Sequence, residues 1–338
     1  MKEKLMRAVV VRNPGSKDPV EVADLPDPGH PRPGEVRVRI HASALNYHDN
    51  IVMADPTTAV GHIPLADGAG VVEAVGEGVT ELTPGDSVVA RFFPTWHAGN
   101  PVIDHFGTTP GIGLPGYARE IVVAPAAQFA RAPRGYSHAE SATLTVAGLT
   151  AWSALMGDRG IKPGDTVVLL GTGGVSMYAL QFAKLAGATT IVTSSSDFKL
   201  ERATALGADY VVNYRTVPDW GDHIHKWTGG GADLVLEVGG PSTLPQSIQA
   251  VRIGGQISMI GVLTGISGEV PTGDIDMKQL TLRGVLVGNH EQQREMTRAI
   301  EASDIRPVID RTFPLEELSE ALRYFTSGTH LGKVIIEV

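Results

Sequence analysis

The first part of the chain, from Ala8 to about Val123, consists of short apolar stretches separated by turn residues. Val36–Ile40 alternates apolar and charged side chains, which is typical of a half-buried strand. Gly68–Gly76 is an apolar run bounded by glycines, and the turn sequence Pro84-Gly85-Asp86 follows it. These patterns predict a compact β-rich domain, in the form of a barrel or a sandwich.

After Ser141 the pattern changes to strands that alternate with helices, which predicts a parallel sheet wrapped by crossover helices. One predicted helix carries apolar residues at spacings of three and four, namely Val175, Ala179, Phe182, Ala183 and Ala186. The predicted strands are Thr166–Leu170, Thr190–Thr193, Tyr210–Asn213, Asp233–Glu237, Gln256–Ile260 and Thr281–Val287. This arrangement is typical of a doubly wound nucleotide-binding fold, so the fold class is α/β.

Beyond Asn289 the pattern indicates one more helix, a Phe313-Pro314-Leu315 segment and a final strand, Lys333–Val338. This tail is too short to form a domain, and we expect it to return to the first one. The sequence therefore predicts two domains. Residues 1–138 and 290–338 form a β-rich domain, and residues 139–289 form a dinucleotide-binding domain inserted into it.

Composition narrows the function. The formal net charge is -9, which argues against nucleic acid or an anionic membrane as a partner and leaves a small-molecule substrate. The chain contains no cysteine, which excludes disulfides, a thiolate nucleophile and any cysteine-based zinc site. It has no apolar run long enough to cross a bilayer and no apolar signal segment after Met1, so we expect a cytoplasmic location.

The strongest motif is a glycine turn between a predicted buried strand and a predicted helix. Gly171, Thr172, Gly173, Gly174 and Val175 make the turn, and Ser176 stands where the usual fingerprint has its third glycine. Such a turn lets a pyrophosphate approach the backbone at the N-terminus of a helix. A glycine turn alone can be purely structural, but its place in an alternating domain favours dinucleotide binding.

A serine-rich segment follows the second predicted strand, where NAD-binding folds carry an acidic residue for the ribose 2′-hydroxyl. Here the residues are Ser194, Ser195, Ser196 and Lys199. Hydroxyls and an ammonium group accept a 2′-phosphate, so the segment favours NADP(H) over NAD. Two alternatives stay open: the serines can cap the next helix, and Asp197 can turn toward the ribose.

Several motifs in one order resemble the medium-chain dehydrogenase/reductase superfamily. They are Gly68–Val72, Pro84–Asp86, Ala147–Trp152, Gly171–Ser176 and Gly332–Val334. The resemblance covers nearly the whole chain. It implies a GroES-like catalytic domain built from both termini, a Rossmann domain between them and an active site in the cleft. A homodimer formed through the sheet of the nucleotide domain is usual in such families.

The chain departs from the zinc alcohol dehydrogenases of that superfamily at the metal. Asn46 and Ala66 stand at two ligand positions, and the region around Val146 is apolar at the third. The cysteine-rich structural lobe is replaced by the loop Arg91–Gly116. The chain therefore resembles the zinc-independent, quinone-oxidoreductase-like branch, whose members reduce quinones, enones or related activated double bonds with NADPH. No metal is expected.

A metal site built from histidines is the alternative to this view. The predicted catalytic domain contains His41, His48, His62, His97 and His105. None of them has the tight spacing of metal ligands, and scattered histidines are usually surface or hydrogen-bonded residues.

The resemblance places the active centre at Asn46, Tyr47 and His48. Without zinc, a hydrogen-bond donor must stabilise the negative charge that develops on the substrate oxygen. Tyr47 can donate its phenol proton, His48 lies where alcohol dehydrogenases keep a hydroxyl of their proton relay, and Asn46 can orient the ribose or the substrate carbonyl. Alternatively, Tyr47 only packs against the cofactor and His48 faces solvent.

Further contacts are expected from position in the fold. The carboxyl ends of parallel strands bind ligands in such sheets, and aromatic side chains can form the walls of an apolar substrate pocket or belong to the core. The expected cofactor contacts are Thr150, Tyr214, Val238, Gly261, Val262, Leu263, Val287, Gly288 and Asn289. The expected pocket residues are Phe92, Phe93 and Trp96.

Three functions are compatible with these residues. The first is NADPH-dependent reduction of a quinone or an α,β-unsaturated carbonyl compound. The second is a zinc-free, NADP-dependent alcohol dehydrogenase or carbonyl reductase, in which His48 or Tyr47 protonates the alkoxide. The third is an NADPH-binding protein with little turnover. The first two differ in whether a C=C or a C=O bond is reduced, and the third in whether NADPH is consumed.

Overall fold

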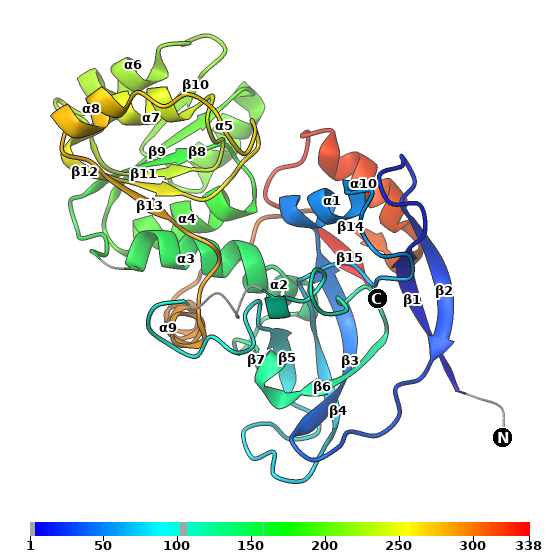
Figure 1. Ribbon diagram of the computed structural model, residues 1–338. Coiled ribbons are helices and arrows are strands. Elements are labelled where there is room, and N and C mark those ends of the chain that lie inside the picture. Colours follow the sequence, from blue (N-terminus) through cyan, green and yellow to red (C-terminus); the bar gives the residue numbers. More distant parts are fainter. Residues whose placement is uncertain (1–3, 102–106, 158) are drawn as a thin grey trace. The chain divides into compact units, whose positions relative to one another are not determined.

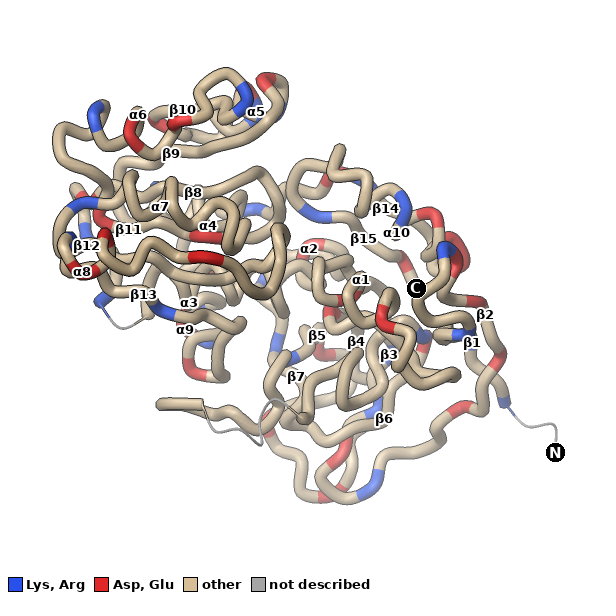
Figure 2. Tube along the Cα trace, turned by 45° about the horizontal axis from the view of Figure 1, so that its top comes forward, with Lys and Arg blue, Asp and Glu red and all other residues tan. Residues whose placement is uncertain are grey.

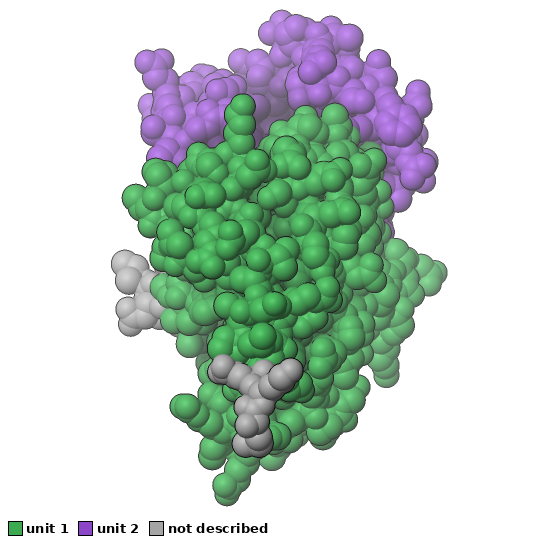
Figure 3. Space-filling view, turned by 90° about the vertical axis from the view of Figure 1, so that its right-hand side faces the viewer, with its two compact units in different colours: residues 1–149, 288–338 green, residues 150–287 purple. Residues whose placement is uncertain are grey.

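The computed structural model describes residues 4–101, 107–157 and 159–338, and the chain divides into two compact units. The first comprises Met1–Leu149 and Gly288–Val338, and the second comprises Thr150–Val287 (Figure 3). The mixed α/β fold predicted from the sequence, a Rossmann domain with a GroES-like β-rich domain, is confirmed. The first unit continues past the predicted boundary at residue 138, because the helix that begins there packs against strands of this unit.

The described part of the first unit consists of a two-stranded and a seven-stranded sheet with short helices (Figure 1). Its strands are β1 Leu5–Val11, β2 Val20–Pro26, β3 Glu35–Ala44, β4 Ala69–Val75, β5 Ser87–Ala90, β6 Ile121–Pro125, β7 Phe129–Arg131, β14 Ile309–Pro314 and β15 Lys333–Glu337. Its helices are α1 Tyr47–Ala54, α2 His138–Ala142, α9 His290–Glu301 and α10 Leu318–Thr326, with short turns of helix at Ala126–Gln128, Leu144–Gly148 and Leu315–Glu317.

The larger sheet of this unit joins both ends of the chain. Its order is β14-β15-β3-β4-β5-β7, and β6 also pairs with β3. The last strand, β15, runs antiparallel to β3 with Ile335 opposite Ala44. The expectation that the C-terminal tail returns to the first domain is therefore confirmed. The prediction of a single helix after Asn289 was wrong, because Leu318, Ala321 and Leu322 form the buried face of a second helix, α10.

The second unit has a parallel sheet of six strands among the described residues, in the order β10-β9-β8-β11-β12-β13. These strands are β8 Thr166–Leu170, β9 Thr189–Ser194, β10 Tyr210–Asn213, β11 Ala232–Glu237, β12 Val251–Met259 and β13 Thr281–Gly284. Numbered along the unit, the order is that of the doubly wound dinucleotide-binding fold. It places the carboxyl ends of β8 and β11, on either side of the reversal in strand order, next to each other.

Helices cover both faces of this sheet, with α3 and α4 on one side and α6 and α7 on the other (Figure 1). The helices are α3 Leu149–Met156, α4 Gly174–Leu185, α5 Asp197–Ala205, α6 Trp220–Trp227, α7 Leu244–Ala250 and α8 Thr272–Met277. The predicted apolar face of α4 is largely confirmed, since Ala179, Phe182 and Ala183 are fully buried. Burial of such a face against the sheet is the main source of stability of a helix this short.

Acidic and basic residues are interspersed along the described trace of both units (Figure 2). Among the described residues, no helix has the length and apolar character that a bilayer crossing requires.

Candidate functional site

The predicted cofactor turn lies between β8 and α4 in the second unit. Gly171 has a φ of 71°, a left-handed conformation that favours glycine. Gly173 is the N-cap of α4 and has an ordinary backbone, and a Cβ added there would meet no atom within 4 Å. The fold itself gives no steric reason for a glycine at residue 173. Close approach of a group from outside the chain gives one, so the turn fits a bound pyrophosphate.

The remaining residues of this turn explain its departure from the usual fingerprint. No side chain caps the first turn of α4. The backbone N–H groups that follow Gly173 therefore have no side-chain acceptor at this end of the helix. Ser176 is buried, and its hydroxyl donates to the carbonyl oxygen of Leu170 at 2.7 Å. The serine at the third position therefore ties the helix to the end of β8 by a hydrogen bond.

The serine-rich segment follows β9 in the second unit. Ser194 is buried, and its hydroxyl oxygen accepts a hydrogen bond from the amide of Ser196 at 3.3 Å. Ser196 is the N-cap of α5 by position, but its side chain makes no capping hydrogen bond. The backbone amide of Tyr214 donates to the carbonyl of Ser194 at 3.0 Å, which places these two residues side by side. The other two predicted residues of the segment, Ser195 and Lys199, are half-buried.

Asp197 was the main reason to consider NAD in place of NADP. Its carboxylate accepts a hydrogen bond from Nδ2 of Asn213 at 2.7 Å, on an exposed part of the unit. The carboxylate thus has a partner on the adjacent strand β10. The residue at the end of β9 itself is a serine.

Other expected cofactor contacts lie where β11 and β12 end. A Cβ added at Gly261 would lie 2.0 Å from the carbonyl oxygen of Val238, so these two predicted residues are in backbone contact. The side chains of Val262 and Leu263 are 36% and 52% exposed. Residues with exposed apolar side chains at the carboxyl edge of such a sheet are suited to contact a ligand.

A buried carboxylate shapes the turn after β11. Glu237 is 0% exposed, and its Oε1 accepts from the amides of Gly239 at 2.7 Å and Gly240 at 3.0 Å and from the hydroxyl of Thr243 at 2.6 Å. Its Oε2 accepts from the hydroxyl of Ser247. The turn that follows Val238 is therefore fixed by four neutral donors on one side chain.

The last predicted cofactor residues lie in α3 and at the end of the second unit. Thr150, in α3, is buried. Val287 is buried and has a φ of 53°, an uncommon conformation for a β-branched residue. Strained backbone of this kind is concentrated at functional sites. Gly288 begins the second segment of the first unit, and the next residue, Asn289, caps α9 by accepting from the amide of Gln292 at 2.9 Å.

The predicted catalytic residues lie at the start of α1 in the first unit. Asn46 is buried, and its amide group is fully engaged: Oδ1 accepts from Lys333, while Nδ2 lies 3.3 Å from both the carbonyl of Ala44 and Oδ2 of Asp49. The other two residues are more accessible. Tyr47 is 38% exposed. The side chain of His48 is 23% exposed, with Nε2 3.2 Å from Oδ1 of Asp49 but out of hydrogen-bonding alignment.

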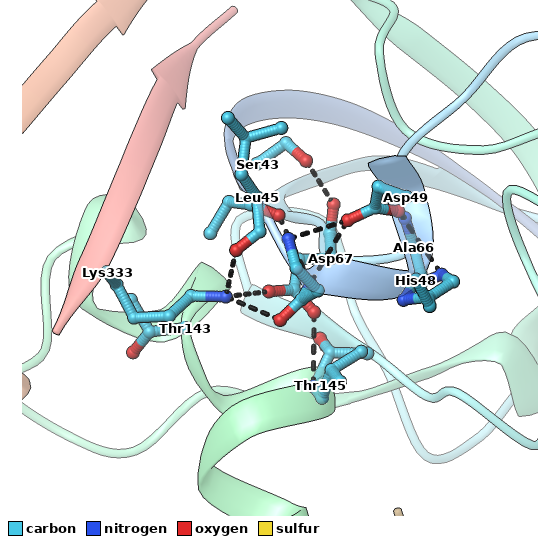
Figure 4. A network of polar contacts seen from close by, with 12 residues as sticks. Ser43, Leu45, His48, Asp49, Ala66, Asp67, Thr143, Thr145 and Lys333 are labelled. Atoms are coloured by element: carbon cyan, nitrogen blue, oxygen red, sulfur yellow. Dashed lines mark hydrogen bonds and ion pairs between the residues drawn. The ribbon is translucent and has the colours of Figure 1, made fainter. Parts of the chain in front are cut away.

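Asn46 belongs to a buried polar network that sequence reasoning missed (Figure 4). Its other members are Asp49 in α1, Asp67 just before β4 and Lys333 at the start of β15, which are 1%, 0% and 3% exposed. Burial raises the pKa of the Asp67 carboxyl, and the neighbouring Lys333 ammonium and Asn46 amide oppose this rise. A lysine that opens an apolar C-terminal strand was the available signal in the sequence.

The carboxylates of this network hold backbone groups from separate segments. Asp49 accepts from the amide of Asn46 at 2.8 Å through Oδ2 and from the amide of Ala66 at 3.1 Å through Oδ1. Asp67 accepts from the amide of Val146 at 3.1 Å. The resemblance to zinc alcohol dehydrogenases puts the three zinc-ligand positions at Asn46, at Ala66 and in the region around Val146. Among the described residues, no group of three or more histidines and carboxylates is arranged to hold a metal ion.

The predicted pocket aromatics form a run of ring contacts beside His48. The rings of His48 and Phe92 meet edge to face at 5.6 Å, and Phe92, Phe93 and Trp96 continue the series at 4.7 and 5.5 Å. Phe92 and Phe93 are only 4% and 1% exposed, which fits the alternative that they belong to the core. Trp96 is half-buried.

Two histidines connect the described part of the loop Arg91–Gly116 to α9. Nδ1 of His97 lies 3.1 Å from Nδ1 of His290, and Nε2 of His290 lies 2.9 Å from the carbonyl of Phe93. Burial lowers the pKa of His290 to about 4. A neutral His290 donates to Phe93 and accepts from His97, so these rings are hydrogen-bond partners rather than open ligands. His105, also considered as a metal ligand, lies outside the described residues.

Two family models match the chain, one in each part of the fold. Residues 32–134 match the alcohol dehydrogenase GroES-like domain. Residues 174–302 match the model described as zinc-binding dehydrogenase.

Whole-chain comparisons agree with these matches. A zinc-type alcohol dehydrogenase-like protein of Schizosaccharomyces pombe is 43% identical over 319 residues, which cover 90% of this chain and 91% of that protein. A solved structure of an NAD-dependent alcohol dehydrogenase superposes with a TM-score of 0.88 at 37% identity, covering 98% of this chain and 100% of the other. A crotonyl-CoA carboxylase/reductase in complex with NADP superposes with a TM-score of 0.85 at 25% identity, covering 99% and 95%.

Proposed function

The chain belongs to the medium-chain dehydrogenase/reductase superfamily, and from this premise we propose that it is a zinc-independent, NADPH-dependent oxidoreductase. Its substrate in this proposal is a quinone or an α,β-unsaturated carbonyl compound, whose activated C=C bond accepts the hydride. The observation that carries the proposal is the set of hydrogen bonds made by residues 45–49, which we call the active-centre loop. Its amide and carboxylate groups are engaged in an internal network around Lys333, whereas the side chain of Tyr47 is 38% exposed and that of His48 is 23% exposed.

The absence of zinc from the proposed reaction rests on the residue types at the three positions. Alanine and valine side chains offer no ligand atom for zinc. On Asn46, Oδ1 accepts from the Lys333 ammonium, and Nδ2 is a donor that faces the Ala44 carbonyl and the Asp49 carboxylate. An acceptor that is already activated by a conjugated carbonyl needs positioning and a hydrogen-bond donor more than a Lewis acid. This is why a conjugated acceptor is favoured over a simple alcohol or ketone.

The cofactor part of the proposal is NADP(H), which supplies the hydride when bound. The glycine turn from Gly171 to Val175 is suited to the pyrophosphate, because Gly173 leaves room for it. Ser194 ends β9 without placing a negative charge beside a 2′-phosphate, and Tyr214 lies next to it. Asp197, the nearby acid, is bonded to Asn213. These features support NADPH over NADH.

Two residues of this chain would act on the substrate. Tyr47 would donate a hydrogen bond or a proton from its phenol to the developing oxyanion. His48 would relay a proton only if the product is an alcohol. The partial exposure of both side chains at the start of α1, 38% for Tyr47 and 23% for His48, supports these roles.

A second candidate is a zinc-free alcohol dehydrogenase or carbonyl reductase. It is favoured by the position of His48, whose Nε2 lies 3.2 Å from the buried Asp49 carboxylate.

The experiment that decides between them is NADPH oxidation against a panel of quinones, enones, aldehydes and ketones, with product identification. We expect a saturated C–C bond with the carbonyl retained, or a hydroquinone. Formation of an alcohol from aldehydes or ketones would establish the second candidate. Binding of NADPH without consumption of any acceptor in the panel would contradict both and indicate a binding protein.

The assembly and location complete the proposal. We propose a homodimer formed through the nucleotide-domain sheet, because β13 is an edge strand whose backbone groups can pair with a second copy. Light scattering on the purified protein measures the number of copies in the assembly. A cytoplasmic location remains part of the proposal on the sequence grounds given above.

A further inference from the structure

The ammonium group of Lys333 is almost completely buried and uses all three of its hydrogen-bond donors. It donates to the carbonyl of Leu45 at 2.7 Å, to Oδ1 of Asn46 at 2.6 Å and to Oδ2 of Asp67 at 3.1 Å (Figure 4). Burial of an ammonium is costly, and an apolar side chain of similar length fills such a space at lower cost. The cation therefore needs a reason beyond packing.

Two of the three acceptors lie in the segment that enters α1. Leu45 and Asn46 directly precede Tyr47, the first residue of the helix. Lys333 binds the carbonyl of one and the side chain of the other, while Asp49 binds the amide of Asn46. The start of α1 is thus held from both sides by charged groups.

The same network holds a strained turn on the opposite side. Leu65 has a φ of 75°, which a non-glycine residue rarely adopts. The next residue, Ala66, is held through its amide by Asp49, and Asp67 is held by Lys333. Asp67 is buried near a second carboxylate, that of Asp49, which contributes to raising the pKa of the Asp67 carboxyl, and the Lys333 ammonium opposes this rise at 3.1 Å.

We propose that Lys333 is a positioning residue for hydride transfer: its ammonium group locks Leu45, Asn46 and Asp67 and thereby sets the place of Tyr47 and His48. This inference rests on the proposed function, because Tyr47 and His48 are its acting residues. The ammonium is an internal cation that organises a loop from which metal ligands are missing. It touches neither substrate nor cofactor in this role, and acts through the start of α1.

The test compares Lys333→Met, which keeps the length of the side chain and deletes the charge, with Lys333→Arg, which keeps the charge in a different shape. Lys278→Met is the matched control. Lys278 also gives three hydrogen bonds to carbonyl oxygens, those of Ile248, Gln249 and Val251, at 2.8 to 3.0 Å, but it lies in the second unit and has no bond to the network.

Three quantities are measured on the purified full-length variants: kcat with the best acceptor of the panel, the Kd of NADPH by fluorescence titration, and amide hydrogen exchange in peptides that cover residues 43–54. For Lys333→Met we expect kcat to fall about 10- to 100-fold, since a displacement near 1 Å has effects of this size, with the Kd of NADPH changed less than twofold. Exchange in residues 43–54 should accelerate at least tenfold. Lys333→Arg should recover part of kcat, and Lys278→Met should leave all three quantities near wild type.

The outcomes separate this inference from the proposed function. If no acceptor turns over in the wild type, the proposed function fails, and the exchange experiment alone decides whether Lys333 fixes the loop. Unchanged exchange in residues 43–54 of Lys333→Met overturns the inference. So does accelerated exchange with a wild-type kcat, or an equal loss of kcat in Lys278→Met. If Lys333→Met does not fold, Lys333→Gln, which also deletes the charge, replaces it, and wild-type kcat and exchange in that variant overturn the inference.

Discussion

Asp67 in the first unit and Glu237 in the second are both fully buried carboxylates, and they satisfy their charge by different means. Glu237 uses neutral donors that all lie within ten residues of it in the sequence. Asp67 uses Val146, which is 79 residues away, and Lys333, which is 266 residues away. One carboxylate shapes a single turn, and the other joins three distant segments.

The difference shows how the cofactor turn region of the second unit and the active-centre loop of the first unit are each built. The edge of the nucleotide unit is organised locally, by a glycine turn and by the Glu237 carboxylate, which accepts hydrogen bonds from the amides of the turn that follows it. The active-centre loop is held by a residue far from it in the sequence. Lys333 binds Asn46 and also pairs with Asp67. Local devices can be recognised in a sequence, whereas pairs of this kind require the fold.

The largest effect is expected from Asp67→Asn, which leaves the Lys333 ammonium buried without its counter-charge. Loss of one member of a buried pair costs about 3–5 kcal/mol in the free energy of unfolding. Urea denaturation followed by tryptophan fluorescence measures this. Glu237→Gln is the control, and because its partners are neutral we expect a smaller loss of about 1–3 kcal/mol. Equal losses in the two variants would remove the distinction between the two carboxylates.

The next effect concerns the chemistry that the long-range network is proposed to support. Tyr47→Phe keeps the ring and deletes the phenol, so kcat should fall about 10²- to 10⁴-fold if the phenol acts as a general acid. The Kd of NADPH should stay nearly fixed. Steady-state kinetics with the best acceptor and fluorescence titration of NADPH give the two values.

His48→Gln is the contrast to Tyr47→Phe. A carbonyl reductase that relays protons through His48 should lose rate in this variant, whereas a double-bond reductase protonated by water should retain it. Small and equal effects of both substitutions would mean that neither residue carries the chemistry, and that catalysis rests on positioning the acceptor.

A smaller effect is expected on the nucleotide side of the comparison. Ser194→Asp places a carboxylate at the end of β9, where it would repel a 2′-phosphate. We expect NADPH binding to weaken by about 1–3 kcal/mol, which is roughly tenfold to hundredfold, with little change for NADH. Titration of both cofactors against both proteins measures this. A wild-type preference for NADH would contradict the assignment of the serine segment.

No effect is expected from metal removal. If Lys333 is the cation of the active-centre loop, prolonged treatment with a strong chelator should leave kcat within experimental error. Metal analysis of the active protein accompanies the assay. Stoichiometric zinc whose removal abolishes activity would contradict both the zinc-independent proposal and the role given to Lys333.

The sequence predicted the nucleotide unit more completely than the first unit, for physical reasons. All six of its strands were located, because buried parallel strands bounded by turns are local patterns. Their ends were less certain: β12 begins at Val251, before the predicted Gln256, and β13 ends at Gly284, before the predicted Val287. Hydrogen bonding with neighbouring strands sets such ends, and a single sequence does not contain it.

The active-centre loop shows the limit of local reasoning. Its position at Asn46, Tyr47 and His48 followed from a resemblance, but the engagement of the Asn46 amide did not, because its partner Lys333 lies 287 residues away. The burial of Phe92 and Phe93 also depends on the fold. A pattern in the sequence identifies a charged residue beside an apolar run, and only the packing identifies its partner.

The origin of Lys333 in the last strand also sets the order in which the protein can be completed during synthesis. The nucleotide unit is one continuous segment and, among the described residues, contains every strand of its own sheet, so it can fold before the C-terminal part of the first unit is synthesised. Asp67 is synthesised early, but its cation Lys333 follows 266 residues later. Until Lys333 leaves the ribosome, the first unit lacks strand β15 and Asp67 has no counter-charge. A ribosome stalled just before Lys333 therefore exposes a folded cofactor domain attached to an unfinished catalytic one.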